Sequence, residues 1–343
     1  MEKNINYPCK FKKYEKELIE IRRHLHRHPE LGLQEFETCA FIRSYLEKLG
    51  YRLTGVEPTG WIAEHPCQDT ACFDDKKLVV LRAEMDALPI QEQTGLSYAS
   101  EKSGVMHACG HDGIVAAALI LARILAEEGE AFPVKMRFLF EPAEEIGEGA
   151  RRMLEAGALD PKPDAFLMFH YAVDESFGMA VHKGQASAMI NGMEIRVHGK
   201  SSHWCQASHG VDSIYAASLV VQAFHDLNES YQGKGPCLVG IGTVHGGEYS
   251  NIIADLVTLK GNIRAAYEED YNALDERIRG ALKEIEKRTG TRIEMEYPKP
   301  AVLPFANDDE LTHICAAAGK KVFGEHFILE NEDQLFLSGD NAY

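Results

Sequence analysis

Apolar and polar positions along the chain fall into blocks that predict helices and strands. Apolar residues recur at helical spacing over 14–25 and again over 36–49. Three short apolar runs, at 77–82, 134–140 and 165–169, are typical of buried strands. The N-terminal half therefore predicts two amphipathic helices followed by the strands of one sheet.

Helical patterns also separate these three strands. Residues 113–126, rich in small and branched apolar side chains, lie between the first strand and the second, and 149–155 lies between the second and the third. Alternation of strands and helices is the pattern of a sheet that is mostly parallel. We expect an α/β catalytic domain built on such a sheet.

The pattern changes after residue 187. The segment 188–298 predicts a compact α+β insert, and prolines at 298, 300 and 304 mark the return to the first domain. The organisation expected is therefore 1–187 and 299–343 for the catalytic domain, with 188–298 inserted. The insert contains the following predicted elements: strand 193–197, helix 211–228, strands 238–244 and 257–265, helix 271–288 and strand 291–297.

Composition narrows the class of protein. The chain has 343 residues, with 45% hydrophobic and 26% charged residues, as in ordinary globular proteins. A formal net charge of -17 argues against a nucleic acid or an anionic membrane as partner, since both would be repelled. No uncharged apolar stretch is long enough for a membrane span, and residues 1–6 lack the apolar run of a signal peptide. Eight scattered cysteines fit reduced thiols, so we expect a cytoplasmic enzyme.

Chemically active residues follow each of the three predicted strands. Asp86 follows the first, Glu144 and Glu145 follow the second, and His170 follows the third. In open α/β sheets ligands bind beyond the carboxyl ends of the strands, where residues distant in sequence converge. The pattern favours a metal hydrolase site at that edge.

The cluster at 107–112, His-Ala-Cys-Gly-His-Asp, lies between the first two strands. The thiolate of Cys109 and the imidazole of His111 are good ligands for a borderline cation such as Zn²⁺. A Cys-x-His triplet is also compatible with a buried cysteine near a polar histidine. The carboxylates and His170 at the other strand ends favour the metal interpretation.

Two adjacent carboxylates at a strand end repel each other, which costs free energy unless the two groups have separate roles. We assign Glu145 to the metal and Glu144 to the proton, as the general base that deprotonates a metal-polarised water. Acidic residues also favour the first turn of a helix, which is the alternative for this pair. Asp86 either orients a ligand or caps a turn, and His170 is either a ligand or a hydrogen-bonded core histidine.

Together these motifs resemble the metal-dependent amidohydrolase branch of the aminoacylase and carboxypeptidase superfamily. That branch includes hippurate hydrolases, N-acyl-L-amino-acid amidohydrolases and indole-acetyl-amino-acid hydrolases. The matching segments are 23–32 with Glu35 and Thr38, then 59–60, 82–89, 107–112, 140–145, 199–203, 251–255 and 261–264.

The resemblance implies a zinc-peptidase-like catalytic domain whose insert serves as a dimerisation or lid domain, and hence a homodimer. It implies Cys109, His111, Glu145 and His170 as metal ligands and Glu144 as general base. The same comparison has His203 enter the active site of the partner subunit to stabilise the oxyanion. Asn251 and Arg264 match positions that bind substrate.

The end of the chain departs from this pattern. Residues 338–343 resemble a segment after which relatives continue to a final metal-binding histidine. We expect the second part of the catalytic domain to be truncated, with that histidine absent. A site with three protein ligands and water can still bind a catalytic zinc.

We therefore expect a metal-dependent hydrolase of N-acyl-amino acids or small peptide-like substrates, with Asp86, Glu144 and His203 in catalytic roles. The cofactor expected is Zn or Mn, with Co or Ni as alternatives, at one or two ions per subunit. Two rivals remain open: a catalytically impaired, metal-binding or dimeric interaction protein, and a cysteine hydrolase that pairs Cys109 with His107 or His111.

Overall fold

The computed structural model divides the chain into two compact units. Unit 1 comprises Met1–Gly178 and Lys320–His326, and unit 2 comprises Met179–Gly319 and Phe327–Tyr343. The domain boundaries at 188 and 298 stay a prediction. The structure describes residues 9–65, 76–129, 133–171, 177–330 and 337.

Unit 1 contains a five-stranded sheet of order β1-β2-β4-β3-β5. Strand β3 lies between β4 and the edge strand β5 and pairs in parallel with both, whereas β2 pairs antiparallel with β4 and with β1. The carboxyl ends of β3, β4 and β5 therefore meet at one edge, as the strand pattern predicts. The strand bounds are β1 Arg52–Gly55, β2 Trp61–Glu64, β3 Leu78–Glu84, β4 Lys135–Glu141 and β5 Ala165–Leu167.

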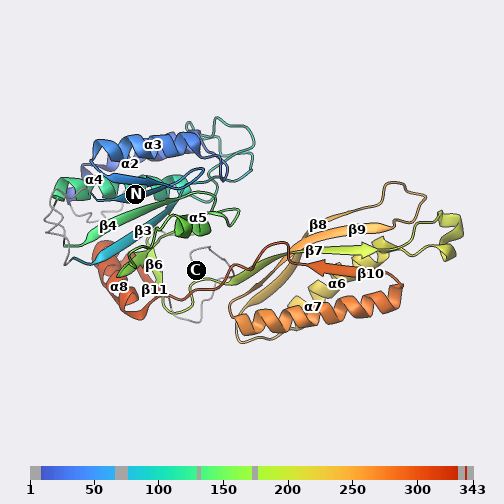
Figure 1. The fold of residues 1–343 in the computed structure, drawn as a ribbon. Coiled ribbons are helices and arrows are strands. Elements are labelled where there is room, and N and C mark those ends of the chain that lie inside the picture. The colour runs from blue at the N-terminus through green and yellow to red at the C-terminus, as the bar shows by residue number, and fades with distance from the viewer. Residues whose placement is uncertain (1–8, 66–75, 130–132, 172–176, 331–336, 338–343) are drawn as a thin grey trace. The chain divides into compact units, whose positions relative to one another are not determined.

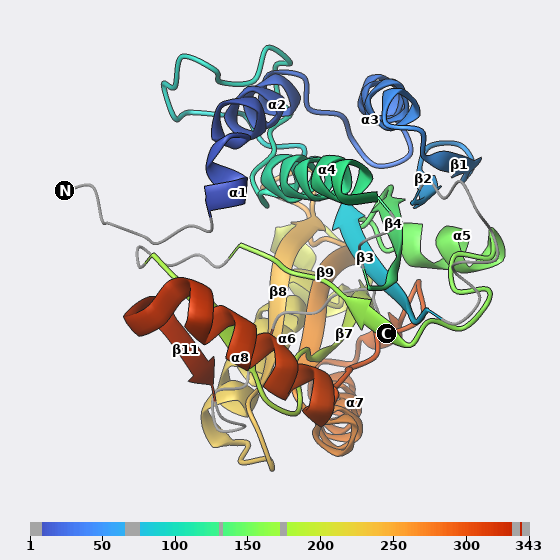
Figure 2. The ribbon, with the colours of Figure 1, turned by 90° about the vertical axis from the view of Figure 1, so that its left-hand side faces the viewer.

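Helices cover both faces of this sheet. Figure 1 and Figure 2 show α3 and α4 on one face, with α2 beside α4, and α5 on the opposite face. Alternation along β4 explains the two layers, because Phe138 and Phe140 join the larger core whereas Leu139 packs with Met153 of α5. The helix bounds are α1 Cys9–Lys12, α2 Glu15–Arg27, α3 Phe36–Lys48, α4 His111–Glu128 and α5 Gly149–Glu155.

Unit 2 contains a four-stranded antiparallel sheet of order β10-β7-β9-β8. Two helices, α6 and α7, lie along one face of it (Figure 1), and their apolar sides form a second core with Ile195 and Leu259. The element bounds are β7 Met189–His198, α6 Ser213–Ser230, β8 Cys237–Gly246, β9 Leu256–Ala265, α7 Glu268–Thr289 and β10 Arg292–Glu296.

The prediction of an α/β catalytic domain with a separate α+β sheet domain is confirmed. Unit 2 also holds a parallel pair, β6 Met179–His182 with β11 Phe327–Glu330, which the apolar pattern does not reveal. Helix α8 spans Asp309–Phe323.

Some predictions fall on segments that the structure does not describe. They are residues 1–6 and 338–343, and the cysteines at 67 and 72. For Cys9 the structure describes only the backbone. The five cysteines with described side chains, at 39, 109, 205, 237 and 315, are free thiols. Among the described residues we find no helix with the length and hydrophobicity of a membrane span.

Candidate metal centre

Three segments of the chain bring the predicted ligands together at the carboxyl edge of the unit 1 sheet. Cys109 and His111 lie at the start of α4, the Glu144-Glu145 pair follows β4, and His170 follows β5. The potential ligand atoms of Cys109, His111 and His170 all lie within 4.8 Å of one another, and so do those of His111, Glu144 and Glu145. His111 belongs to both groups and joins them into one site.

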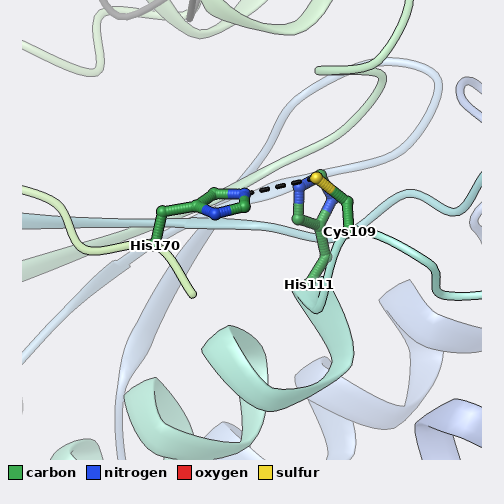
Figure 3. A group of neighbouring side chains, drawn as sticks. All are labelled: Cys109, His111 and His170. Carbon is green, nitrogen blue, oxygen red and sulfur yellow. Dashed lines mark hydrogen bonds between the residues drawn. The ribbon is translucent and has the colours of Figure 1, made fainter. Parts of the chain in front are cut away.

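The two histidines are oriented by backbone carbonyl groups. His111 Nδ1 donates a hydrogen bond to the carbonyl oxygen of Asp86 at 2.9 Å, and His170 Nδ1 donates to that of Tyr171 at 2.9 Å. A neutral imidazole held in this way keeps its lone pair on Nε2, the usual arrangement for a metal-binding histidine. His170 Nε2 points at Cys109 Sγ across 3.3 Å (Figure 3).

Unsatisfied buried atoms show that these residues fit a divalent metal. Nε2 of His111 and Oε1 of Glu145 are buried, and neither has a hydrogen-bond partner in the described part of the chain. Such atoms are costly unless something else binds them. Thiolate, imidazole and carboxylate are together a donor set for zinc or a similar first-row ion.

Mutual contacts shift the pKa values in the cluster. The contacts with His111 and His170 hold the pKa of the Cys109 thiol below its usual range. The contact with Cys109 raises the pKa of His170 to about 9, despite opposition from burial. Burial, in contrast, raises the pKa of Glu145. These shifts favour the thiolate form of Cys109 beside a positive charge. A bound metal cation supplies that charge without protonation of the two histidines.

Asp86 contacts both His111 and Glu145 and does not face solvent. Its side chain is fully buried. Oδ2 accepts a hydrogen bond from the backbone N–H of Glu145 at 3.0 Å, and Oδ1 lies 3.3 Å from His111 Nδ1. Asp86 therefore contacts both the His111 ring and the backbone of Glu145, and it can hold these two candidate ligands in position.

Sequence reasoning left two buried residues near this edge without a role. His26, of the alternating His24, His26 and His28, is 3% exposed and lies 2.9 Å from Asp112, the neighbour of His111. Glu35 has no exposed surface and accepts a hydrogen bond from the backbone N–H of Ala143 at 2.7 Å. Glu35 is among the positions that match the family pattern, but an acidic residue at the start of a helix gives no sign that its side chain points inward, so its role is not predicted.

The pairing of Cys109 with His107 in the cysteine-hydrolase rival is absent from the described structure. Both ring nitrogens of His107 are buried and have no hydrogen-bond partner among the described residues. Burial lowers the pKa of His107 to about 4, so its ring is neutral at ordinary pH. His111 and His170 are instead the imidazoles that contact the thiol.

Three predicted residues, His203, Asn251 and Arg264, belong to unit 2. The Nε2 atom of His203 lies 3.4 Å from the Asn251 side-chain amide, and both residues are exposed. Arg264 on β9 donates from Nε to Asn262 Oδ1 at 2.9 Å and from Nη1 to the carbonyl oxygen of Leu337 at 2.9 Å. His203 and Asn251 thus form one pair, while Arg264 has other partners.

Comparison with known proteins gives a consistent result. Residues 80–342 match the sequence profile of Peptidase family M20/M25/M40. The chain is 34% identical over 316 residues to the N-acetyl-L-cysteine deacetylase of Bacillus subtilis, covering 92% of this chain and 74% of that protein. It is 33% identical over 335 residues to the hippurate hydrolase of Campylobacter jejuni, covering 95% and 84%.

A solved structure agrees with these relatives. The crystal structure of a dinuclear metal-binding peptidase of the M20 family from Bacillus subtilis matches with a TM-score of 0.75 and 31% identity, covering 96% of this chain and 85% of that one. The chain therefore belongs to Peptidase family M20/M25/M40 and is a metal-dependent amidohydrolase.

Proposed function

We propose that this enzyme hydrolyses the amide bond of N-acyl-amino acids or small peptide-like substrates. The names of two relatives, an N-acetyl-L-cysteine deacetylase and a hippurate hydrolase, support this substrate class. Both names describe a small acyl group joined to an amino acid through an amide.

The observation that carries the proposal is the position of Glu144 beside the candidate ligands. One carboxylate oxygen of Glu144 lies within 4.8 Å of the ligand atoms of both His111 and Glu145. A half-buried carboxylate at that distance can act on a water held next to the metal. Glu145 then serves as ligand with Cys109, His111 and His170.

A bound divalent metal supplies Lewis acidity, which polarises the amide carbonyl and lowers the pKa of water. Glu144 accepts a proton from the attacking water as the new carbon–oxygen bond forms. It then delivers that proton to the nitrogen as the carbon–nitrogen bond breaks. The products are a carboxylic acid and the free amine of the amino acid.

His203 is proposed as the donor to the oxygen that becomes negatively charged. Its Nδ1 accepts a hydrogen bond from the backbone N–H of Cys205 at 3.2 Å, which leaves Nε2 as the ring nitrogen for the substrate. We propose a homodimer in which His203 acts on the partner's site, with Asn251 and Arg264 binding the substrate. An arginine is suited to a free carboxylate, which it can bind through two parallel hydrogen bonds.

The metal proposed is zinc or manganese, with cobalt or nickel as alternatives. The thiolate of Cys109 and the two imidazoles favour zinc, whereas carboxylates also accept manganese. His111 contributes to both groups of potential ligands, so the site has donors for one or two ions.

Replacement of Glu144 by Gln tests the proposal. Glu144→Gln is expected to retain metal and to lose turnover by about 10²–10⁴-fold, the usual contribution of a general base. Glu148→Gln, in the same loop, is the matched control because the Glu148 carboxylate pairs with exposed Arg151 at 3.0 Å. Metal content and hydrolysis of N-acetyl- and N-benzoyl-amino acids are measured for both variants and the wild type.

The same experiment separates the rival functions. Wild-type turnover in Glu144→Gln would contradict the proposed role of Glu144. A folded wild-type protein that binds metal and hydrolyses no substrate would favour the metal-binding interaction protein instead.

A further inference from the structure

We propose that Glu35 is a positioning residue for the reaction, because its carboxylate holds the turn that presents Glu144 and Glu145 to His111. Glu35 lies immediately before α3, far in sequence from that turn. The part of this proposal that concerns turnover rests on the function proposed above.

The turn after β4 has an unfavourable backbone conformation just before the two glutamates. Ala143 has a φ of 54°, in the left-handed region that residues other than glycine rarely adopt. Such conformations persist only when surrounding contacts enforce them, and they cluster at functional sites. The contacts of Ala143 therefore decide where the next two side chains point.

Two buried carboxylates hold the backbone on either side of Glu144. Glu35 Oε1 accepts a hydrogen bond from the N–H of Ala143 at 2.7 Å, and Asp86 Oδ2 accepts one from the N–H of Glu145 at 3.0 Å. Both carboxylates have 0% exposure, so bulk solvent does not reach these bonds. Glu35 and Asp86 thus fix the residues before and after the proposed base.

Glu35 is itself held by a second contact. The hydroxyl of Thr59, which is 1% exposed, donates to Glu35 Oε2 at 2.6 Å. The neighbouring residue Gly60 packs against the same turn, since a Cβ added there would lie 2.9 Å from Pro142 Cδ. The loop between β1 and β2 and the start of α3 therefore meet at the turn, with Glu35 between them.

The chain offers a matched control in Glu30. This carboxylate is 7% exposed and accepts hydrogen bonds from the backbone N–H groups of Glu37 and Thr38, at 3.2 and 2.8 Å. Loss of Glu30 should weaken the same region of the fold through a similar kind of bond. Its hydrogen bonds go to the start of α3 instead of the turn at 143–145.

The test compares Glu35→Met, Glu35→Gln and Glu30→Met as full-length protein. Glu35→Met leaves the N–H of Ala143 buried without its acceptor, so kcat should fall roughly 10- to 100-fold with little change in KM. Glu35→Gln should restore kcat, because its amide oxygen accepts from Ala143 and its NH2 group donates to Thr59. Glu30→Met should lower the melting temperature and leave kcat close to that of the wild type.

Cobalt binding gives a second measurement that does not depend on turnover. Because Glu145 follows the held turn, Glu35→Met should also bind Co²⁺ roughly 10- to 100-fold more weakly and change the visible spectrum of the cobalt protein. Glu30→Met should leave both unchanged. If the wild type binds Co²⁺ but hydrolyses no N-acyl-amino acid, the proposed function fails while this comparison still tests Glu35.

The proposal is overturned if folded Glu35→Met keeps wild-type kcat and Co²⁺ affinity, or if Glu30→Met loses as much of both. If Glu35→Met does not fold, Glu35→Asp replaces it. The shorter side chain keeps the charge but cannot span the contacts to Ala143 and Thr59, so the same losses are expected. Wild-type kcat and Co²⁺ affinity in Glu35→Asp would then overturn the proposal.

Discussion

The carboxylate of Asp86 accepts a hydrogen bond from the backbone N–H of Glu145 at 3.0 Å, and its backbone carbonyl accepts one from His111 Nδ1 at 2.9 Å. Asp86 thus connects the loop after β3 to two candidate ligands on different elements. Because Asp86 contacts two candidate ligands and is not itself one of them, its replacement tests how the site is assembled.

Replacing Asp86 by Ala should weaken metal binding by roughly 10- to 100-fold, because the backbone N–H of Glu145 loses its acceptor and the His111 ring loses the carboxylate beside it, although the backbone carbonyl remains. Metal affinity is measured by competition with a chromophoric chelator. Asp164→Ala is the control, since Asp164 also accepts a backbone N–H, that of Leu78 at 2.8 Å, at the other end of β3. Equal metal affinity in Asp86→Ala and the wild type would contradict the assigned role.

Cys109 should react with iodoacetamide only when the protein lacks metal. As a ligand, its sulfur is blocked by the ion, whereas in the metal-free protein the contact with His170 lowers the pKa of the thiol and favours its reactive form. Cys205 is exposed and should be modified in both states, which makes it the internal control. Modification is followed on the separate peptides by mass spectrometry. Equal labelling of Cys109 with and without metal would argue that the sulfur is not a ligand.

His203 should complement a defect in the partner subunit. We expect that mixing Glu144→Gln with His203→Ala gives hybrid dimers with one site that has both residues intact. Random exchange should restore about a quarter of wild-type turnover, since half the dimers are hybrids with one working site each. Each variant alone should stay inactive. Subunit exchange is verified with differently tagged chains, and verified hybrids without turnover would place His203 in its own subunit's site or outside catalysis.

Gly113 should be sensitive to an added methyl group although it lies in a helix. A Cβ at this position of α4 would lie 2.7 Å from Tyr171 Cε2, so Gly113→Ala should destabilise the fold by about 1–3 kcal/mol through overpacking. Gly280 in α7 has no atom within 4 Å of an added Cβ, and Gly280→Ala should stabilise by about 1 kcal/mol. The free energy of unfolding is measured in urea. Stabilisation by Gly113→Ala would contradict the contact with Tyr171.

The sequence predicts the long elements well because their apolar periodicity is strong. The pattern at 149–155 coincides with α5, and the apolar run at 134–140 lies within one residue of β4 at each end. The short strands β1 and β2 escape prediction, since four residues such as Trp61–Glu64 carry too little periodicity. Their antiparallel pairing with β4 depends on long-range contacts.

The residues of the candidate site also differ in how well the sequence predicts them. Cys109, His111 and His170 carry ligand chemistry in their side chains, so the cluster at 107–112 and the histidine after a strand are enough to suggest a metal. Glu35 acts through a hydrogen bond to Ala143, 108 residues away in sequence. Such partnerships depend on tertiary packing, and the residue types involved are too common to be distinctive.

The central claim is that hydrolysis depends on a metal held by Cys109, His111, Glu145 and His170. The most direct measurement is the rate of N-acyl-amino-acid hydrolysis before chelation, after metal removal, and after stoichiometric Zn²⁺ or Mn²⁺ is restored. We predict that turnover disappears with the metal and returns with about one or two ions per subunit. Turnover that survives complete metal removal, and is abolished by alkylation of Cys109, would contradict the account and favour a cysteine hydrolase.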